Sequence, residues 1–216
     1  MRTQTDHEIQ VESGGAQLRG MLGLPEGARG VALFAHGSGS GRFSPRNQFV
    51  AASLRERGLG TLLIDLLEGW ESEDRAKVFD IDLLSERLMS ATEWLRSNED
   101  TSALSLGYFG ASTGAAAALQ AAAALGDEID AVVSRGGRPD LAMPYLWQVA
   151  APTLLIVGGD DYPVIPLNKQ AYDRLSCVKE LVIVPRATHL FEEPGALDEV
   201  ARLAGEWFEK YLAGNA

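Results

Sequence analysis

The hydrophobic positions of this chain fall into short apolar, β-branched runs that alternate with longer stretches of helical spacing. An apolar run between turn residues is typical of a buried strand, whereas apolar residues three and four apart predict an amphipathic helix. The runs predict strands at residues 8–13, 17–25, 31–36, 60–65, 104–110, 131–135, 153–159 and 180–185. The helical spacing predicts helices at residues 46–57, 81–97, 112–125, 167–176 and 195–212.

This order of elements predicts an α/β fold. Strands that alternate with helices favour a mostly parallel sheet of about eight strands with helices on both faces. The first two strands are expected to pair antiparallel instead, because Ser13, Gly14 and Gly15 between them suit a tight turn. A length of 216 residues suits one compact domain, so we predict a single domain over residues 1–216.

Composition narrows the class of protein. Apolar residues make up 46% of the chain and charged residues 23%, as in ordinary soluble globular proteins. The net charge is -11 and the basic residues are scattered, so nucleic acid is not an expected partner.

The N-terminal residues lack the pattern of a secretory signal and no apolar stretch reaches membrane-spanning length, so we expect a cytoplasmic protein that does not bind membranes. The single Cys177 excludes an internal disulfide, and the charged stretch at residues 68–77 is predicted to be a solvated loop.

Ser112 stands between the predicted strand 104–110 and an alanine-rich helix, within the pattern Gly110-Ala111-Ser112-Thr113-Gly114. Ligands of open parallel sheets bind beyond the carboxyl ends of the strands, where this turn lies. A strand, G-x-S-x-G and a helix are the context of a nucleophile elbow, and the glycines make room where strand and helix nearly touch. The alternative is that Ser112 is an ordinary helix N-cap.

A nucleophilic serine needs a base, and the base needs an acid that orients it. His189 is the one histidine downstream of Ser112, and it follows the last predicted strand, although a surface-loop histidine is the alternative. Asp160 and Asp161 follow the preceding strand, and because adjacent side chains point in different directions, one of them is expected to reach His189. Asp140 is a further candidate acid.

A tetrahedral intermediate also needs two backbone N–H donors. Thr113 supplies the first, because it follows the nucleophile. Ser38 supplies the second, in a glycine-rich loop at the end of the strand 31–36. A phosphate-binding role for this loop is excluded by the missing Lys and Ser/Thr of a P-loop. His36 is predicted to be a buried residue that braces the loop.

Five segments together resemble the dienelactone hydrolase-related family of the α/β-hydrolase superfamily: FAHGSGSGR, GYFGASTGAAAAL, AVVSRGGRPDLA, TLLIVGGDDYPVIPLN and VPRATHLFEEPGALDEVARLAGEWF. The resemblance covers nearly the whole chain and implies an α/β-hydrolase fold. It favours Asp161 as the acid, because the spacing of Gly158, Asp161 and Val164 is usual in that superfamily. Dienelactone hydrolases proper use a cysteine nucleophile where this chain has Ser112, so the lactone substrate is not implied. Similar segments also occur joined to phosphoribosyltransferase domains, which we do not expect within this sequence.

We therefore predict a serine hydrolase that cleaves small carboxylic esters with a catalytic triad of Ser112, Asp161 and His189 and an oxyanion hole at Ser38 and Thr113. The triad needs no metal and no organic cofactor. Thioester, lactone or amide hydrolysis on the same triad is the first alternative, because a triad does not select the leaving group. A catalytically quiet ligand-binding module and a metal-dependent hydrolase are the others.

Two features bear on the substrate, for which we expect a small-molecule ester. Residues 135–152, where many hydrolases carry a lid, form a short segment, which predicts an open pocket without a large lid. Arg135 ends a strand on the reactive edge and is predicted either to bind a substrate carboxylate or to pair with Asp140. The sequence leaves both a monomer and a homodimer open.

Overall fold

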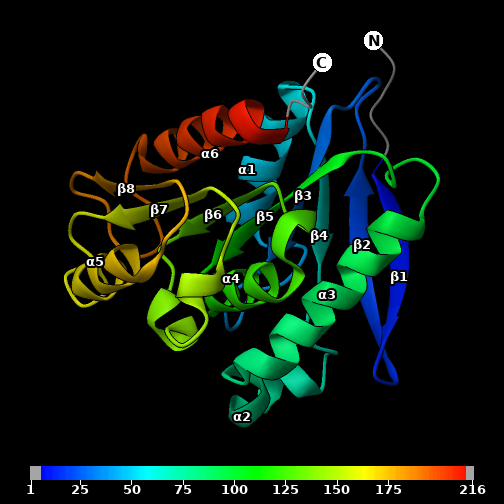
Figure 1. Cartoon of the computed structure of the whole chain (residues 1–216), viewed down its shortest axis with the longest axis horizontal. Helices are drawn as coiled ribbons and strands as arrows, with labels where there is room; N and C mark the ends of the chain where they lie inside the picture. The colour runs from blue at the N-terminus through cyan, green and yellow to red at the C-terminus, as the bar shows by residue number, and fades with distance from the viewer. Residues whose placement is uncertain (1–5, 213–216) are drawn as a thin grey trace.

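The computed structural model describes residues 6–212, which form one eight-stranded sheet in the order β1-β2-β4-β3-β5-β6-β7-β8 (Figure 1). Neighbouring strands from β4 to β8 are parallel, whereas β1 and β2 are antiparallel to each other and β2 is antiparallel to β4. The predictions for the first five residues and for residues 213–216 lie outside the described residues. The strands are β1 His7–Ser13, β2 Ala16–Gly23, β3 Gly30–Ala35, β4 Gly60–Ile64, β5 Ser105–Ala111, β6 Ala131–Arg135, β7 Thr153–Gly158 and β8 Lys179–Val184.

Helices cover both faces of the sheet, which confirms the predicted fold class (Figure 1). One face carries α1 (Pro45–Glu56) and α6 (Ala196–Leu212), and the other carries α3 (Ile81–Ser97), α4 (Thr113–Leu125) and α5 (Ile165–Arg174). The short α2 (Arg75–Val78) precedes α3. Single 3₁₀ turns lie at Glu71–Glu73, Gly126–Glu128, Pro139–Ala142 and Leu146–Gln148.

The β1–β2 hairpin forms for the predicted reason. Ser13 pairs with Ala16, and the two residues between them, Gly14 and Gly15, have φ values of 54° and 86°. Two successive positive φ angles give a two-residue turn whose twist matches that of the flanking strands. This hairpin extends the parallel sheet at the β4 edge.

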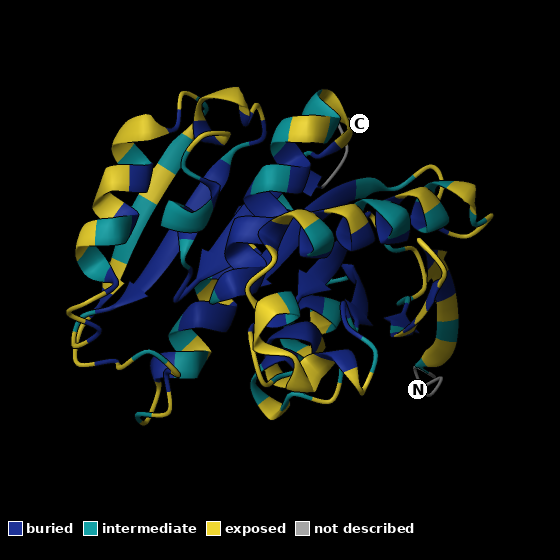
Figure 2. Cartoon of the chain, turned by 90° about the horizontal axis from the view of Figure 1, so that it is seen from below, coloured by how far each residue is buried: buried dark blue, intermediate teal, exposed yellow. Residues whose placement is uncertain are grey.

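The core lies on both sides of the central strands, which are buried along their length (Figure 2). Helix α4 is buried on nearly all of its faces because its alanine side chains allow it to lie close against the sheet. Half-buried Cys177 packs against the apolar cluster on the α4 side of the sheet. No helix within residues 6–212 combines the length and the apolar character needed to cross a bilayer.

The prediction of a fully solvated loop at residues 68–77 is wrong in part. This stretch contains a 3₁₀ turn and most of α2, and the side chain of Glu71 is buried. Glu73, Asp74 and Arg75 are exposed, whereas Glu68 and Lys77 are half-buried. The stretch is therefore a folded segment held by the buried carboxylate of Glu71. The side chains that bind this carboxylate lie beside the candidate active site.

Candidate active site

The turn from β5 into α4 presents Ser112 in a strained backbone conformation. Ser112 has φ 52° and ψ -121°, which is costly for a residue with a Cβ. Its side chain makes no capping hydrogen bond to α4, so it is not acting as an N-cap. The Ser112 N–H donates to the carbonyl of Arg135 at 3.4 Å, and the Arg138 N–H donates to the carbonyl of Ser112 at 3.0 Å. The end of β6 and its following loop thus hold this turn.

Close backbone contacts explain the glycines around Ser112. A Cβ at Gly110 would collide with the backbone of Ala115, and one at Gly114 would collide with the carbonyl oxygens of Ala35 and His36. A Cβ at Gly37 would lie 2.8 Å from the Cβ of Ser112. The start of α4 therefore packs against the end of β3, and the glycine-rich loop passes directly beside Ser112.

The His36 side chain supports the glycine-rich loop, as predicted from its position in the sequence. Its Nε2 accepts a hydrogen bond from the Leu66 N–H at 2.9 Å, and its Nδ1 lies 3.0 Å from the carbonyl oxygen of Gly37. Burial lowers the pKa of His36, so the ring is neutral, with a proton on Nδ1 and a lone pair on Nε2. Both ring nitrogens are then satisfied.

The loop and the start of α4 place unpaired donors around a small cavity. Ser38 and Thr113 both line it, together with Leu67, Ser72 and Val78. The N–H of Ser38 has no backbone partner within residues 6–212, and the N–H of Thr113 is one of the first N–H groups of α4, which have no partner inside a helix. Both N–H groups are therefore free of backbone partners among the described residues.

The carboxyl ends of β7 and β8 bring Asp161 and His189 together. His189 Nδ1 lies 2.7 Å from Asp161 Oδ2, and Asp161 is buried whereas the His189 side chain is 38% exposed. Asp160 instead accepts a hydrogen bond from the Tyr162 hydroxyl at 3.0 Å. Asp140 forms an ion pair with a loop arginine. Of the three candidate acids, Asp161 is therefore the one that contacts His189.

The His189 loop and the Ser112 turn meet across the end of β6. Arg135 accepts the Ser112 N–H, and a Cβ on the next residue, Gly136, would lie 3.6 Å from His189 Cε1. No hydrogen bond joins Ser112 Oγ to the His189 ring among the described residues. Hydrogen bonds between catalytic groups are often long without substrate and shorten in the substrate complex.

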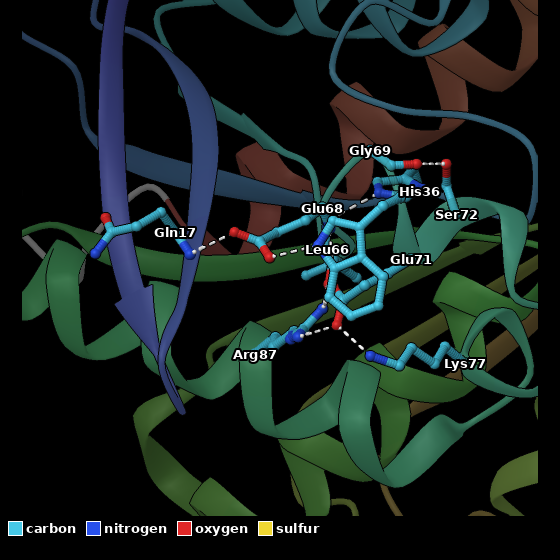
Figure 3. A network of polar contacts seen from close by, with 10 residues as sticks. Gln17, His36, Leu66, Glu68, Gly69, Glu71, Ser72, Lys77 and Arg87 are labelled. Carbon is cyan, nitrogen blue, oxygen red and sulfur yellow. Dashed lines mark hydrogen bonds and ion pairs between the residues drawn. The ribbon is translucent and has the colours of Figure 1, made fainter.

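A buried ion-pair network fixes the segment that follows β4 (Figure 3). Arg87 on α3 donates to both carboxylate oxygens of Glu71, at 2.5 and 3.0 Å, and Lys77 donates to Glu71 at 2.6 Å. The Glu68 N–H adds a fourth bond to this carboxylate at 3.0 Å. These bonds, the one from Arg87 foremost, lower the pKa of Glu71 to about 2.

This network reaches the glycine-rich loop through the backbone of Leu66. Arg87 also donates to the carbonyl of Leu66 at 2.8 Å, while the N–H of Leu66 donates to His36. The Leu66 peptide units are thus held from both sides, and the wall of the small cavity is tied to the loop that carries Ser38. Sequence reasoning missed this link because Arg87 lies sixteen residues from Glu71 and looks like any helix arginine.

Arg135 does not form the predicted pair with Asp140. Asp140 is instead bound by Arg138, with both contacts at 2.8 Å. Arg135 is 7% exposed, and its Nε and Nη1 are buried without a hydrogen-bond partner among the described residues.

A cleft of ≈ 420 Å³ beside the glycine-rich loop is lined by His36 and Phe43, among others. Within residues 6–212, no group of three or more His, Cys, Asp or Glu side chains is placed to hold a metal ion.

The whole chain has a counterpart among solved structures. The crystal structure of dienelactone hydrolase from Anabaena variabilis has 56% sequence identity and a TM-score of 0.94, covering 98% of this chain and 100% of that one. The chain belongs to the dienelactone hydrolase-related family of α/β hydrolases. No family model matches this α/β hydrolase.

Further comparisons extend the relationship. Two Mycobacterium tuberculosis proteins are 54% identical over 209 residues, and both carry the provisional name of a phosphoribosyl transferase. The match covers 97% of this α/β hydrolase but 47% of each relative, so the chain spans about half the length of these curated relatives. Est1E from Butyrivibrio proteoclasticus (15% identity, TM-score 0.79, covering 97% and 100% of the two chains) and a Pyrococcus furiosus esterase (18%, 0.82, 97% and 94%) share the fold.

Proposed function

We propose that this α/β hydrolase is a serine hydrolase that cleaves small carboxylic esters through an acyl-enzyme. Two observations support the proposal: Ser112 is strained and uncapped, and the Asp161–His189 pair lies beyond the same carboxyl ends of the strands, on the other side of the end of β6. Strain of this kind is characteristic of functional positions, and the order Ser, Asp, His is that of the α/β-hydrolase triad. The esterases among the structural neighbours support the reaction class.

The reaction follows from the roles of these groups. Asp161 accepts the Nδ1–H of His189, which leaves Nε2 free to take the proton of Ser112 Oγ as this oxygen attacks the ester carbonyl. The N–H groups of Ser38 and Thr113 stabilise the oxyanion of the tetrahedral intermediate. His189 then returns the proton to the alcohol that leaves, and an acyl-enzyme remains. Water deprotonated by His189 attacks the acyl group and releases the carboxylic acid, which restores Ser112.

The open site supports small substrates. The segment between β6 and β7 consists of short turns, Pro139–Ala142 and Leu146–Gln148, and does not form a large lid. Phe43 lies at the cleft beside the glycine-rich loop and is 66% exposed, so it is positioned to contact a substrate. Tyr145, on the segment between β6 and β7, lines a separate cleft with residues of α3 and α4. We infer short acyl esters as the preferred class.

The transferase name of the curated relatives is not carried over to this chain. Their 209 matched residues correspond to a hydrolase fold here, and the names describe proteins about twice as long. Thioester, lactone or amide cleavage would use the same groups, since the triad does not select the leaving group. No contact within the described residues favours one of these over ester cleavage.

The test combines active-site labelling with kinetics. A fluorophosphonate probe is expected to modify Ser112, as located by peptide mass spectrometry, and Ser112→Ala is expected to lower turnover of 4-nitrophenyl acetate and butyrate by about 10⁴-fold or more. Ser102→Ala, at an exposed serine remote from the site, is the matched control and should retain full activity. Labelling of another residue, or ester cleavage retained by a folded Ser112→Ala protein, would contradict the proposal.

A further inference from the structure

The side-chain hydroxyl of Thr113 is buried without a hydrogen-bond partner. Thr113 is 2% exposed, and its Oγ1 has neither a donor nor an acceptor among residues 6–212. A hydroxyl that loses its water on burial and gains no partner is destabilising, so an unpaired one in a native protein calls for an explanation. The other buried threonines in this part of the chain do have partners, namely Thr61, Thr92, Thr101 and Thr153.

Thr113 lines the small cavity beside the candidate nucleophile. Gly37 and Ser38 line it as well, and its volume is ≈ 10 Å³. One water molecule needs about this much space, so the cavity holds about one oxygen atom. The cavity adjoins Ser112, because Thr113 follows Ser112 directly and a Cβ on Gly37 would lie 3.6 Å from Ser112 Oγ.

The other walls of the cavity suit an anionic oxygen. Leu67, Val78 of α2 and Leu84 of α3 are buried apolar side chains, and no carboxylate is among the described residues that line the cavity. The hydroxyl of Ser72, which also lines it, donates to the carbonyl of Gly69 at 2.7 Å. In apolar surroundings a hydrogen bond is electrostatically stronger than the same bond in water. A donor in this cavity therefore has a large effect on a charged oxygen.

Buried contacts hold the cavity wall in place before any substrate binds. The Leu66 N–H donates to His36 at 2.9 Å, and the Leu66 carbonyl accepts from Arg87 at 2.8 Å (Figure 3). Both His36 and the residue that follows Leu66 line the cavity. Donors in a site that is fixed in advance stabilise a developing charge without a cost of rearrangement.

We propose that the hydroxyl of Thr113 is a third oxyanion donor, which makes Thr113 a catalytic residue of the ester cleavage. This inference rests on the proposed function. As Ser112 Oγ bonds to the ester carbon, its proton passes to His189 and the π electrons of the carbonyl move onto the oxygen. This oxyanion accepts from the N–H groups of Ser38 and Thr113 and also from Thr113 Oγ1–H. The hydroxyl thus gains, in the tetrahedral intermediate, the acceptor that it lacks in the free protein.

Thr113→Val tests the proposal because it removes the hydroxyl and nearly keeps the shape of the side chain. We expect kcat for 4-nitrophenyl acetate to fall about 10- to 100-fold, the range for a lost hydrogen bond to a charged group. KM should stay within about twofold, because the bond to the oxyanion forms in the transition state and not in the bound ester. Thr113→Ser keeps a hydroxyl and should retain kcat within about threefold of wild type.

Stability separates this role from a structural one. Because Oγ1 has no partner in the free protein, Thr113→Val should unfold at the same urea concentration as wild type or at a higher one. A structural hydroxyl would instead make the variant less stable. Ser134 on β6 is the matched control, because its hydroxyl is also buried without a partner among the described residues but Ser134 does not line this cavity. Ser134→Ala should keep kcat within about twofold.

Trifluoroacetone gives a readout that does not depend on turnover. It resembles the acyl half of the acetate ester, and it adds to a nucleophilic serine to give a stable tetrahedral oxyanion. Its inhibition constant should rise in Thr113→Val by about the same factor as kcat/KM falls, and Thr113→Ser should bind it like wild type. Should Val prevent folding, Thr113→Ala takes its place in each comparison.

The outcomes distinguish this inference from the proposed function. If wild type cleaves the ester and a fluorophosphonate labels Ser112, the proposed function stands. An unchanged kcat in Thr113→Val, a loss of stability that accompanies the loss of activity, or an equal loss of kcat in Ser134→Ala would then overturn the third donor alone. A wild-type protein that cleaves no ester would overturn the proposed function, and this inference with it.

Discussion

The backbone of Ser112 makes a prediction at the scale of one residue. Its φ of 52° with ψ -121° is unfavourable for any residue with a Cβ, and of the twenty residue types only glycine adopts it at little cost. We expect Ser112→Gly to be more stable than Ser112→Ala by about 1 kcal/mol, although both lack the hydroxyl. Urea unfolding of the two variants measures the difference. Ala111→Gly, one residue earlier in β5, should instead destabilise by about 0.5–1 kcal/mol, and equal stability of the two Ser112 variants would show that the turn is not strained.

Single residues also show how far sequence reasoning reached. Ser112 stands out as a candidate because its serine lies in a G-x-S-x-G turn between a strand and a helix, and His189 because it is the one histidine downstream of that turn. The choice of Asp161 over Asp160 needed the family resemblance, since spacing alone does not tell which of two adjacent carboxylates turns toward a histidine. The same limit applies to Asp140, since a pair with it was one of the two interpretations of Arg135. Arg135 and Arg138 are both near it in sequence, and local loop geometry decided for Arg138.

At the scale of elements, the segment from Leu66 to α2 depends on one carboxylate. The pKa of Glu71 is lowered from 4.5 to about 2, so its ionised form stabilises the fold above pH 4.5, and this contribution is lost as the pH falls from 4.5 toward 2. The shift corresponds to roughly 3 kcal/mol. We therefore expect Glu71→Gln to be destabilised by roughly this amount at pH 7, with the gap to wild type closing below pH 4.5.

Urea unfolding of Glu71→Gln and wild type at several pH values measures this gap. Glu73→Gln, at an exposed position of the same 3₁₀ turn, is the control and should match wild type at every pH. A gap that stays constant from pH 7 to pH 3 would mean that Glu71 acts by shape alone.

The same segment explains which elements the sequence predicted and which it did not. Strands such as β3 and β7 are apolar over most of their length, and helix α3 shows a clear apolar stripe, so their local patterns predict them. The stretch at residues 68–77 has no such periodicity and is rich in charge, which favours a solvated loop. Its structure is fixed by Arg87, which lies on helix α3. A local sequence pattern does not reveal a contact between residues so far apart in the sequence.

At the scale of the whole molecule, the parallel sheet gathers the site. Ser112, Asp161 and His189 are separated by 49 and 28 positions in sequence, yet they follow β5, β7 and β8 and therefore lie beyond the carboxyl ends of strands of the same sheet. This gathering was predictable from the alternation of strands and helices. The sheet order, in which β3 lies between β4 and β5, was not, because side-chain patterns do not determine which buried strands are neighbours.

The overall charge of the molecule acts against esters that carry a negative charge. A net charge of -11 at a distance of roughly 20 Å repels a single negative charge by roughly 2 kcal/mol in water before screening. Salt at 0.15 M shortens the screening length to about 8 Å and nearly removes this repulsion. We therefore expect kcat/KM for mono-4-nitrophenyl glutarate, which carries a free carboxylate, to rise about fivefold between 10 and 150 mM NaCl. Methyl 4-nitrophenyl glutarate, which is neutral, should not respond and is the control in the same titration. A fall of kcat/KM for the acidic ester with salt would mean that basic side chains near the site, and not the net charge of the protein, govern its approach.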